Sequence, residues 1–162
     1  EKTIKKRGLK PISNLTGHQV GRYLVHAGKS LPNVSHFFGS KIKVGEVYAI
    51  EPFVTVASAA GKVKSGKEAT IFRLHKRKSS KNIYAKKLLN YVEKNFRTLP
   101  FAERWTVNTV KKEHRAQAFR ELLASKCFVS YPVYIEASKS PVAQAEHTVL
   151  VVEEGCIVLT KP

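Results

Sequence analysis

The feature that most constrains the fold is a change of hydrophobic period along the chain. Residues 46–56 (EVYAIEPFVTV) and 68–76 (EATIFRLHK) are β-branched, aromatic or alternating in polarity, which predicts strands. From Ile83 the apolar residues follow a helical spacing, and strands return at 145–152 (AEHTVLVV). A chain of 162 residues is long enough for one domain with a core and too short for two ordinary domains. We therefore expect an α+β fold in which a small helical module is flanked by strands.

The central module is predicted to contain three short helices. The first begins at Ile83, and Thr98, Leu99 and Pro100 end it and start a second helix, because proline suits the first turn of a helix. The third covers about 112–126. The residues that we expect to face the core are Leu88, Leu89, Val92, Phe96, Phe101, Ala102, Trp105, Ala118, Phe119, Leu122 and Leu123.

Carboxylates interrupt two of the predicted strands. Glu51 lies in the middle of the apolar segment 46–56, where an unpaired charge is costly, and Pro52 after it favours an edge or a bulge. Glu146 lies at the start of the first strand of a predicted hairpin, whose second strand is 156–160. Both positions suit a carboxylate that is paired or bound to a metal ion.

Two histidines lie in a segment punctuated by glycines, GHQVGRYLVHAG at residues 17–28. Tyr23, Leu24 and Val25 favour a strand. In one continuous strand the even separation of His18 and His26 would place both on the same face. Histidine and glutamate are metal-ligand residue types, although a histidine in a strand is more often a hydrogen-bonded structural residue. None of the common nucleotide, hydrolase or zinc-protease motifs is present.

The net charge of +17 is unusual for a chain of this length. A positive field of this size attracts polyanions, above all nucleic acid, although a surface coated with lysine for solubility gives the same number. The basic run KRKSSK, residues 76–81, is open to the same two interpretations, and Lys76, Arg77 and Lys78 are its candidates for contact with RNA or the ribosome.

The sequence argues against a membrane-spanning protein, a secreted protein and a protein held together by disulfides. No apolar run has the roughly 20 residues that a membrane span needs, and the first ten residues are not a signal peptide. Two cysteines do not make a disulfide scaffold or a four-cysteine zinc site. We therefore expect a reducing, cytoplasmic location. Because the chain begins at Glu1 and lacks Met and Asp, we also expect that residues upstream are missing, cut away or supplied by another chain.

Three strings carry a family resemblance. GHQVGRYLVHAG, GEVYAIEPF and AQAEHTVLV resemble the C-terminal half of type II methionine aminopeptidases of the archaeal kind, and NFRTLPFAERW and SYPV resemble the type II insertion. The resemblance implies the C-terminal half of a pita-bread fold, with a curved, mainly antiparallel sheet and helices. It assigns residues 1–82 and 133–162 to this catalytic half, and residues 83–132 to a small helical, winged-helix-like insertion.

The resemblance also implies the roles of individual residues. His18, Glu51 and Glu146 match metal ligands, Glu146 bridging two divalent ions (Co, Mn, Fe or Zn) and Glu51 also handling the proton of the attacking water. His26 matches the histidine that contacts the scissile amide. The positions that match the surroundings of the methionine substrate are Val25, Pro100, Tyr131 and Gln144. The family usually has an aromatic residue where Ala145 stands. Many type II enzymes also have a histidine in the strand around 70–75, and His75 lies near that position but in a basic stretch.

The family site also needs two aspartates and a further histidine, which lie in its N-terminal half. Since this chain contains no Asp, we expect a partner polypeptide that supplies them, and nascent peptides with an N-terminal Met as substrates near the ribosome. Two alternatives stay open: a non-catalytic relative that binds ribosomes or RNA, and a basic homodimer that completes the sheet without the aspartates.

Overall fold

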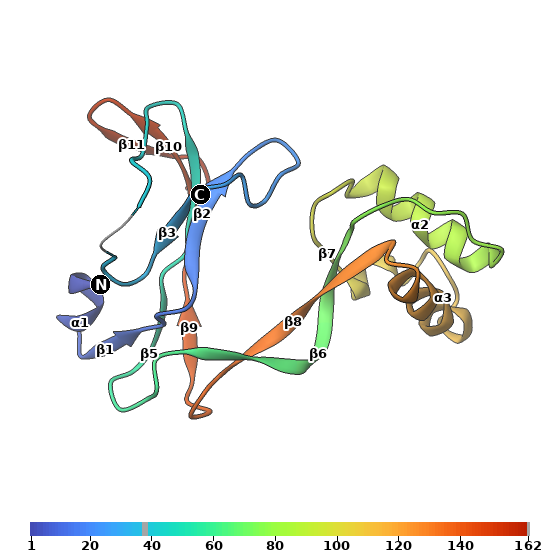
Figure 1. The fold of residues 1–162 in the computed structure, drawn as a ribbon, viewed down its shortest axis with the longest axis horizontal. Helices are drawn as coiled ribbons and strands as arrows, with labels where there is room; N and C mark the ends of the chain where they lie inside the picture. The colour runs from blue at the N-terminus through green and yellow to red at the C-terminus, as the bar shows by residue number, and fades with distance from the viewer. Residues whose placement is uncertain (37–38, 162) are drawn as a thin grey trace. The chain divides into compact units, whose positions relative to one another are not determined.

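The chain folds into two compact units (Figure 1). The computed structural model describes residues 1–36 and 39–161. Unit 1 consists of Glu1–Ser65 and Tyr134–Pro162, and unit 2 consists of Gly66–Val133. In the described part of the chain, no helix is long and apolar enough to cross a membrane.

Unit 1 is built from two antiparallel sheets. The five-stranded sheet has the order β11-β10-β4-β2-β3, and the three-stranded sheet has the order β1-β5-β9. A short helix, α1, precedes the first strand. The bounds of these elements are α1 Lys2–Lys5, β1 Leu9–Pro11, β2 Thr16–Val20, β3 Ser30–Pro32, β4 Val47–Ile50, β5 Phe53–Val56, β9 Val142–Gln144, β10 His147–Val152 and β11 Gly155–Val158.

The two sheets of unit 1 meet at a shared break. The segment predicted as one strand over 46–56 is divided into β4 and β5 by Glu51 and Pro52, as the proline led us to expect. The chain is interrupted again between β9 and β10, at Ala145 and Glu146. β4 pairs with β10 and β5 pairs with β9, so the two interruptions lie opposite each other.

The prediction of a strand at Tyr23–Val25 is wrong. Gly21 and Leu24 bridge each other across a tight turn, with hydrogen bonds in both directions, and Tyr23 has a positive φ of 56°. A left-handed residue in a two-residue connection reverses the chain, which overrides the strand propensity of Tyr, Leu and Val. The segment after the turn therefore runs back along β2, with Ala27 N donating to Gln19 O at 2.8 Å.

Unit 2 packs two helices against a three-stranded sheet of order β7-β6-β8. Its core is one cluster of apolar side chains that includes Phe72, Leu88, Phe101 and Phe119. The elements are β6 Val63–Leu74, α2 Ile83–Asn95, β7 Phe101–Ala102, the 3₁₀-helix η1 Glu103–Thr106, α3 Lys112–Ala124 and β8 Phe128–Glu136; the first residues of β6 and the last of β8 belong to unit 1.

The helix predicted at Ile83 is confirmed, and local chemistry explains where it begins. The Asn82 side chain accepts hydrogen bonds from the backbone N–H groups of Tyr84 and Ala85, which satisfies two donors that a helix leaves unpaired. Leu88, Leu89 and Val92 are all buried, as their spacing predicts. The third predicted helix is α3, in which Ala118, Phe119 and Leu122 are buried and Leu123 packs against the core.

The predicted second helix is wrong in its first part. Phe101 and Ala102 form β7, which pairs with Phe72 and Ile71 of β6, so the chain is extended where a helical turn was expected. Only the 3₁₀-helix η1 follows. Phe101 and Ala102 are buried as expected, whereas Trp105 is 50% exposed, because the tight helix turns its ring toward the surface against Phe96.

The boundary between the units differs from the sequence-based division at residues 82 and 133. Residues 66–82 lie in unit 2, because the second half of β6 pairs with β7 and contributes Phe72 and Leu74 to the core of that unit. The functional assignment of each part stays a prediction.

A buried carboxylate holds a turn of unit 1 together and leads to a pH prediction. Glu136 accepts hydrogen bonds from the hydroxyl of Ser138 and from the backbone N–H groups of Ser138, Ser140 and Gly61. Led by the Ser138 hydroxyl, these donors lower the pKa of Glu136 to about 2. Its folded pKa is depressed, so its contribution to stability is complete above about 4.5 and is lost as pH falls toward 2.

We therefore expect Glu136→Gln to lower the denaturation midpoint at neutral pH, because the amide NH₂ faces donors. The unfolding free energy of the variant should also depend less steeply on pH between 4.5 and 2, because up to about one proton fewer is taken up on unfolding. Urea unfolding at a series of pH values measures both effects. Glu153→Gln, in the exposed hairpin turn, is the matched control. An identical pH profile for Glu136→Gln and the native chain would contradict this assignment.

Candidate functional site

The predicted ligands His18 and Glu51 are in direct contact. β2 pairs with β4 so that His18 is opposite Ala49, two residues before Glu51. His18 is buried, and its Nε2 lies 2.9 Å from Glu51 Oε1. The pairing of β2 with β4 therefore places an imidazole beside the carboxylate at the break between the two sheets.

Gln144 connects the second carboxylate to the first. Its Nε2 donates to Glu51 Oε2 at 3.4 Å and to Glu146 Oε2 at 3.3 Å. Gln144 ends β9 opposite Phe53, and Glu146 lies in the second interruption, directly before His147, which is opposite Ile50. The two interruptions thus bring the carboxylates of Glu51 and Glu146 around a single amide.

The environment of Glu51 favours its protonated form. Burial raises the pKa of the Glu51 carboxyl, and the negative charge of Glu146 raises it further. Contact with His18 and the hydrogen bond from Gln144 act in the opposite direction, and the net effect is upward.

His26 reaches the cluster through the turn at Gly21–Leu24. Its ring centroid lies 4.2 Å from that of His18, with the ring planes inclined by 51°. The proximity that we expected from a shared strand face exists, but its cause is the reversal of the chain after β2. Val25, next to His26, is half-buried in the same segment.

The other predicted site residues lie in unit 2. Pro100 precedes β7, and Tyr131 is part of β8. Lys76, Arg77 and Lys78 are exposed in the loop between β6 and α2. The prediction that Pro100 and Tyr131 border the substrate stays a prediction.

Gly17 is a site residue that the sequence reasoning missed. A Cβ atom at this position would lie 2.4 Å from the backbone oxygen of Ala49 and 3.2 Å from the backbone nitrogen of Glu51. Only glycine allows β2 to approach β4 this closely. A glycine directly before a candidate ligand was the signal that could have identified it.

The donor set has the chemistry of a divalent metal site but does not complete one. One imidazole nitrogen and two carboxylates suit zinc, manganese, iron or cobalt. Among residues 1–36 and 39–161, no group of three or more His, Cys, Asp or Glu side chains is arranged to hold a metal ion. The assignment of His18, Glu51 and Glu146 as metal ligands therefore stays a prediction.

Comparisons with known proteins show a family of metallopeptidases. The model of metallopeptidase family M24 matches residues 1–153. The methionine aminopeptidase of Methanocaldococcus jannaschii is 40% identical over 161 residues, which are 99% of this chain and 53% of that protein. The methionine aminopeptidase of Saccharolobus solfataricus is 38% identical over 164 residues, again 99% of this chain and 54% of that protein.

A solved structure is similar in fold. The structure of a thermophilic Arx1 matches 98% of this chain and 43% of its own, with a TM-score of 0.76 and 22% sequence identity. At this level of identity the likeness concerns the fold alone. The chain spans about half the length of the curated relatives that it matches.

Proposed function

Because this chain belongs to metallopeptidase family M24, we propose that it is part of a methionine aminopeptidase of the type II kind, which removes the N-terminal Met from nascent proteins. The predicted α+β, pita-bread fold is confirmed by the family match and by the similar solved structure. The observation that carries the proposed activity is the cluster in which Glu51 contacts His18 and is linked to Glu146 through Gln144.

The proposed roles follow from the contacts. His18, Glu51 and Glu146 would hold divalent metal, which in this chemistry polarises the peptide carbonyl and lowers the pKa of water. Glu51 would accept the proton of the attacking water and deliver it to the leaving amine. Gln144 would hold the two carboxylates in place, and His26 would contact the scissile amide.

We propose that a second polypeptide segment completes the site. The chain contains no Asp, and the family site needs two aspartates and another histidine. Large apolar side chains that are exposed on unit 1 support a partner, since burial of apolar area favours association. They include Leu24, Val44, Ile50, Val56, Val142, Ile157 and Leu159.

The alternative function is a non-catalytic relative of the same fold that binds RNA or ribosomes. The net charge of +17 favours it, whereas retention of the three candidate ligands favours the enzyme. Native mass spectrometry of the protein from its own source separates the two. We expect the chain with an aspartate-containing segment and two metal ions, and a release of Met from Met-Ala-Ser that a chelator abolishes. A metal-free chain, bound only to RNA and without Met release, would establish the alternative.

Metal content gives a direct test of Glu146. In the assembled protein, Glu146→Ala should weaken metal binding by about tenfold or more, because a carboxylate ligand is lost. Dialysis against a buffered metal solution followed by elemental analysis measures the bound metal. Glu154→Ala, at the exposed turn between β10 and β11, is the control and should keep full metal content. Equal metal content in both variants would refute the assignment of Glu146.

A further inference from the structure

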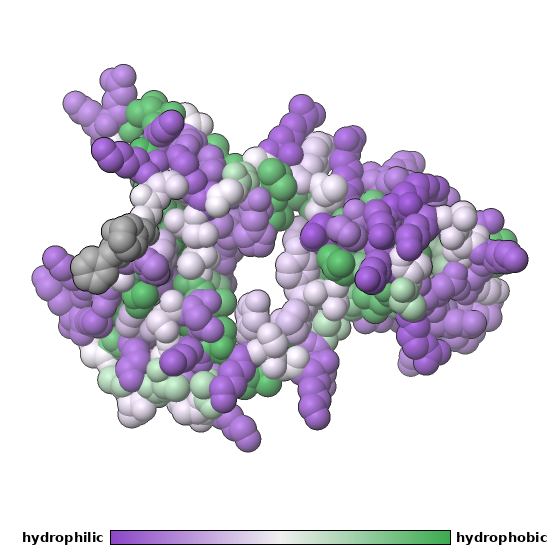
Figure 2. Space-filling model, in the orientation of Figure 1, coloured by the Kyte–Doolittle hydropathy of each residue, from purple (hydrophilic) through white to green (hydrophobic). Residues whose placement is uncertain are grey.

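Positive charge is concentrated in unit 2. Sixteen of the 29 basic residues but only five of the twelve acidic residues lie within Gly66–Val133, so this unit carries +11 of the net +17. Hydrophilic side chains cover most of its visible face (Figure 2). A field of this size attracts a polyanion to unit 2 in particular.

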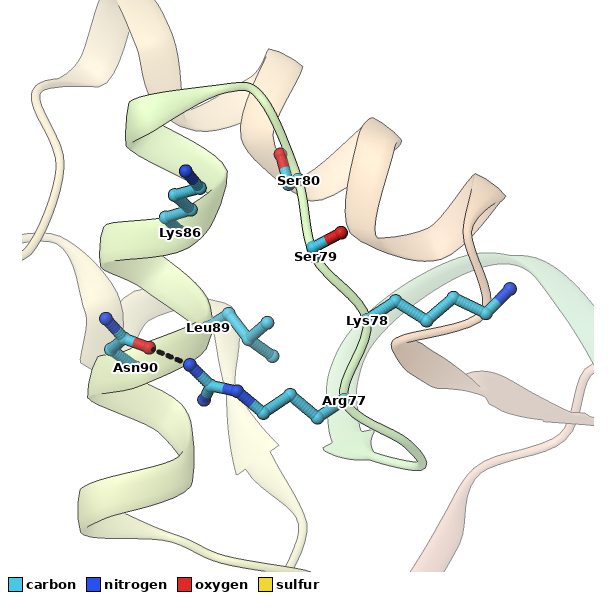
Figure 3. Close-up of a pocket in the computed structure, with 7 residues that line it drawn as sticks. All are labelled: Arg77, Lys78, Ser79, Ser80, Lys86, Leu89 and Asn90. Carbon is cyan, nitrogen blue, oxygen red and sulfur yellow. Dashed lines mark hydrogen bonds between the residues drawn. The ribbon is translucent and has the colours of Figure 1, made fainter.

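A cavity of about 370 Å³ lies within this basic unit, between the loop after β6 and the helix α2 (Figure 3). It is large enough to receive a phosphate group with part of a nucleotide. Its lining contains three cationic side chains, two hydroxyls, an amide and one apolar residue, and it contains no carboxylate. The residues are Arg77, Lys78, Ser79, Ser80, Lys86, Leu89 and Asn90.

The existing contacts divide the cations into two kinds. Arg77 forms an ion pair with Glu93 and donates to Asn90 Oδ1 at 2.8 Å, so its guanidinium is held against α2. Lys78 and Lys86 are exposed, and neither forms an ion pair with a carboxylate of the described residues. Lys86 projects from α2, and Lys78 extends from the loop away from this helix (Figure 3).

We propose that this cavity binds a backbone phosphate of RNA, with Lys78 and Lys86 as the principal cationic contacts. Lysine, serine and asparagine side chains are the groups that proteins commonly use to contact phosphate oxygens. Arg77 is already paired with Glu93, so it adds little net charge to the site. Ser79 supplies an exposed hydroxyl on the loop. The inference goes beyond the proposed peptidase and is independent of it, because none of these residues belongs to the cluster around Glu51.

The charge-removal variant Lys78→Ala/Lys86→Ala tests the proposal on the full chain. Fluorescence anisotropy with a labelled single-stranded oligouridine measures affinity over a range of salt concentrations. We expect binding to weaken by about tenfold at moderate salt. The slope of log K against log salt should fall by about 0.7, because one phosphate contact on a single strand is lost.

Two further variants distinguish binding at this cavity from attraction by the overall positive charge of the chain. Lys62→Ala/Lys64→Ala removes the same charge from exposed positions in unit 1 and should change affinity by less than about twofold. Lys78→Arg/Lys86→Arg keeps both charges and should keep binding. Equal losses in the unit 1 and unit 2 alanine variants would overturn the proposal, as would unchanged RNA affinity in Lys78→Ala/Lys86→Ala. Binding of inorganic phosphate at millimolar concentration is tested by the shift of the Ser79 amide resonance. If phosphate shifts this resonance while Lys78→Ala/Lys86→Ala keeps its RNA affinity, the cavity binds small anions and not RNA.

The peptidase and RNA inferences fail separately. Release of Met by the assembled protein should be the same for the native chain and for Lys78→Ala/Lys86→Ala. A loss of Met release in this variant would place the loop in the peptidase site and overturn an independent RNA site. If the native protein releases no Met but this substitution still weakens RNA binding, the peptidase proposal fails and the phosphate site stands.

Discussion

Replacing Glu51 by Gln in the assembled protein is expected to lower kcat/KM for Met release by about 100- to 10,000-fold, the range that a general base contributes. Glutamine has nearly the shape of glutamate, but it cannot accept a proton from water. It also leaves His18 without its carboxylate partner at 2.9 Å. Initial rates with Met-Ala-Ser, measured with metal in excess, check the expected loss.

Metal analysis of the same variant separates the two roles that we assign to Glu51. Normal metal content with lost turnover indicates that the proton role dominates, whereas reduced metal content indicates that Glu51 is needed as a ligand. Glu153→Gln makes the same chemical change in the exposed turn between β10 and β11 and should keep normal turnover. Full turnover in Glu51→Gln would contradict both roles.

The second large effect is expected from a single methyl group. Gly17→Ala places a Cβ atom 2.4 Å from the backbone oxygen of Ala49, and neither a backbone oxygen nor its strand can move away cheaply. β2 and β4 must separate, so we expect the free energy of unfolding to fall by about 1–3 kcal/mol, the usual cost of overpacking. Since domains are stable by only about 5–15 kcal/mol, this is a large fraction.

The same separation should disturb the site. His18 follows Gly17 directly, and its contact with Glu51 depends on the pairing of β2 with β4. Urea unfolding measures the stability, and metal content of the assembled protein measures the site. Gly39→Ala is the matched control, because a Cβ there meets no atom within 4 Å, and its effect should stay within about 0.5 kcal/mol. If Gly17→Ala keeps the stability and the metal content of the native chain, the close approach of β2 to β4 is unimportant.

Elements with a strong local pattern could be predicted from the sequence. The helix α2 begins at Ile83, after its cap Asn82, and buries Leu88, Leu89 and Val92, because capping chemistry and helical spacing both act within a few residues. The break at Pro52 and the hairpin of β10 and β11 follow from turn chemistry in the same way. Local pattern alone was misleading at Tyr23 and Phe101, where a tight turn and pairing with β6 decided the conformation.

The sequence by itself determined the residue types of the site, its strand segments, the helical module and the excess of positive charge. Only the tertiary structure decided that Glu51 and Glu146 lie around the amide of Gln144, because this depends on the pairing of β4 with β10 and β5 with β9. It also decided that His26 joins His18 through a turn, and that Gly17 must lack a side chain. Local patterns act over a few residues, whereas strand register is set by partners distant in the sequence, so these contacts could be found only in the folded chain.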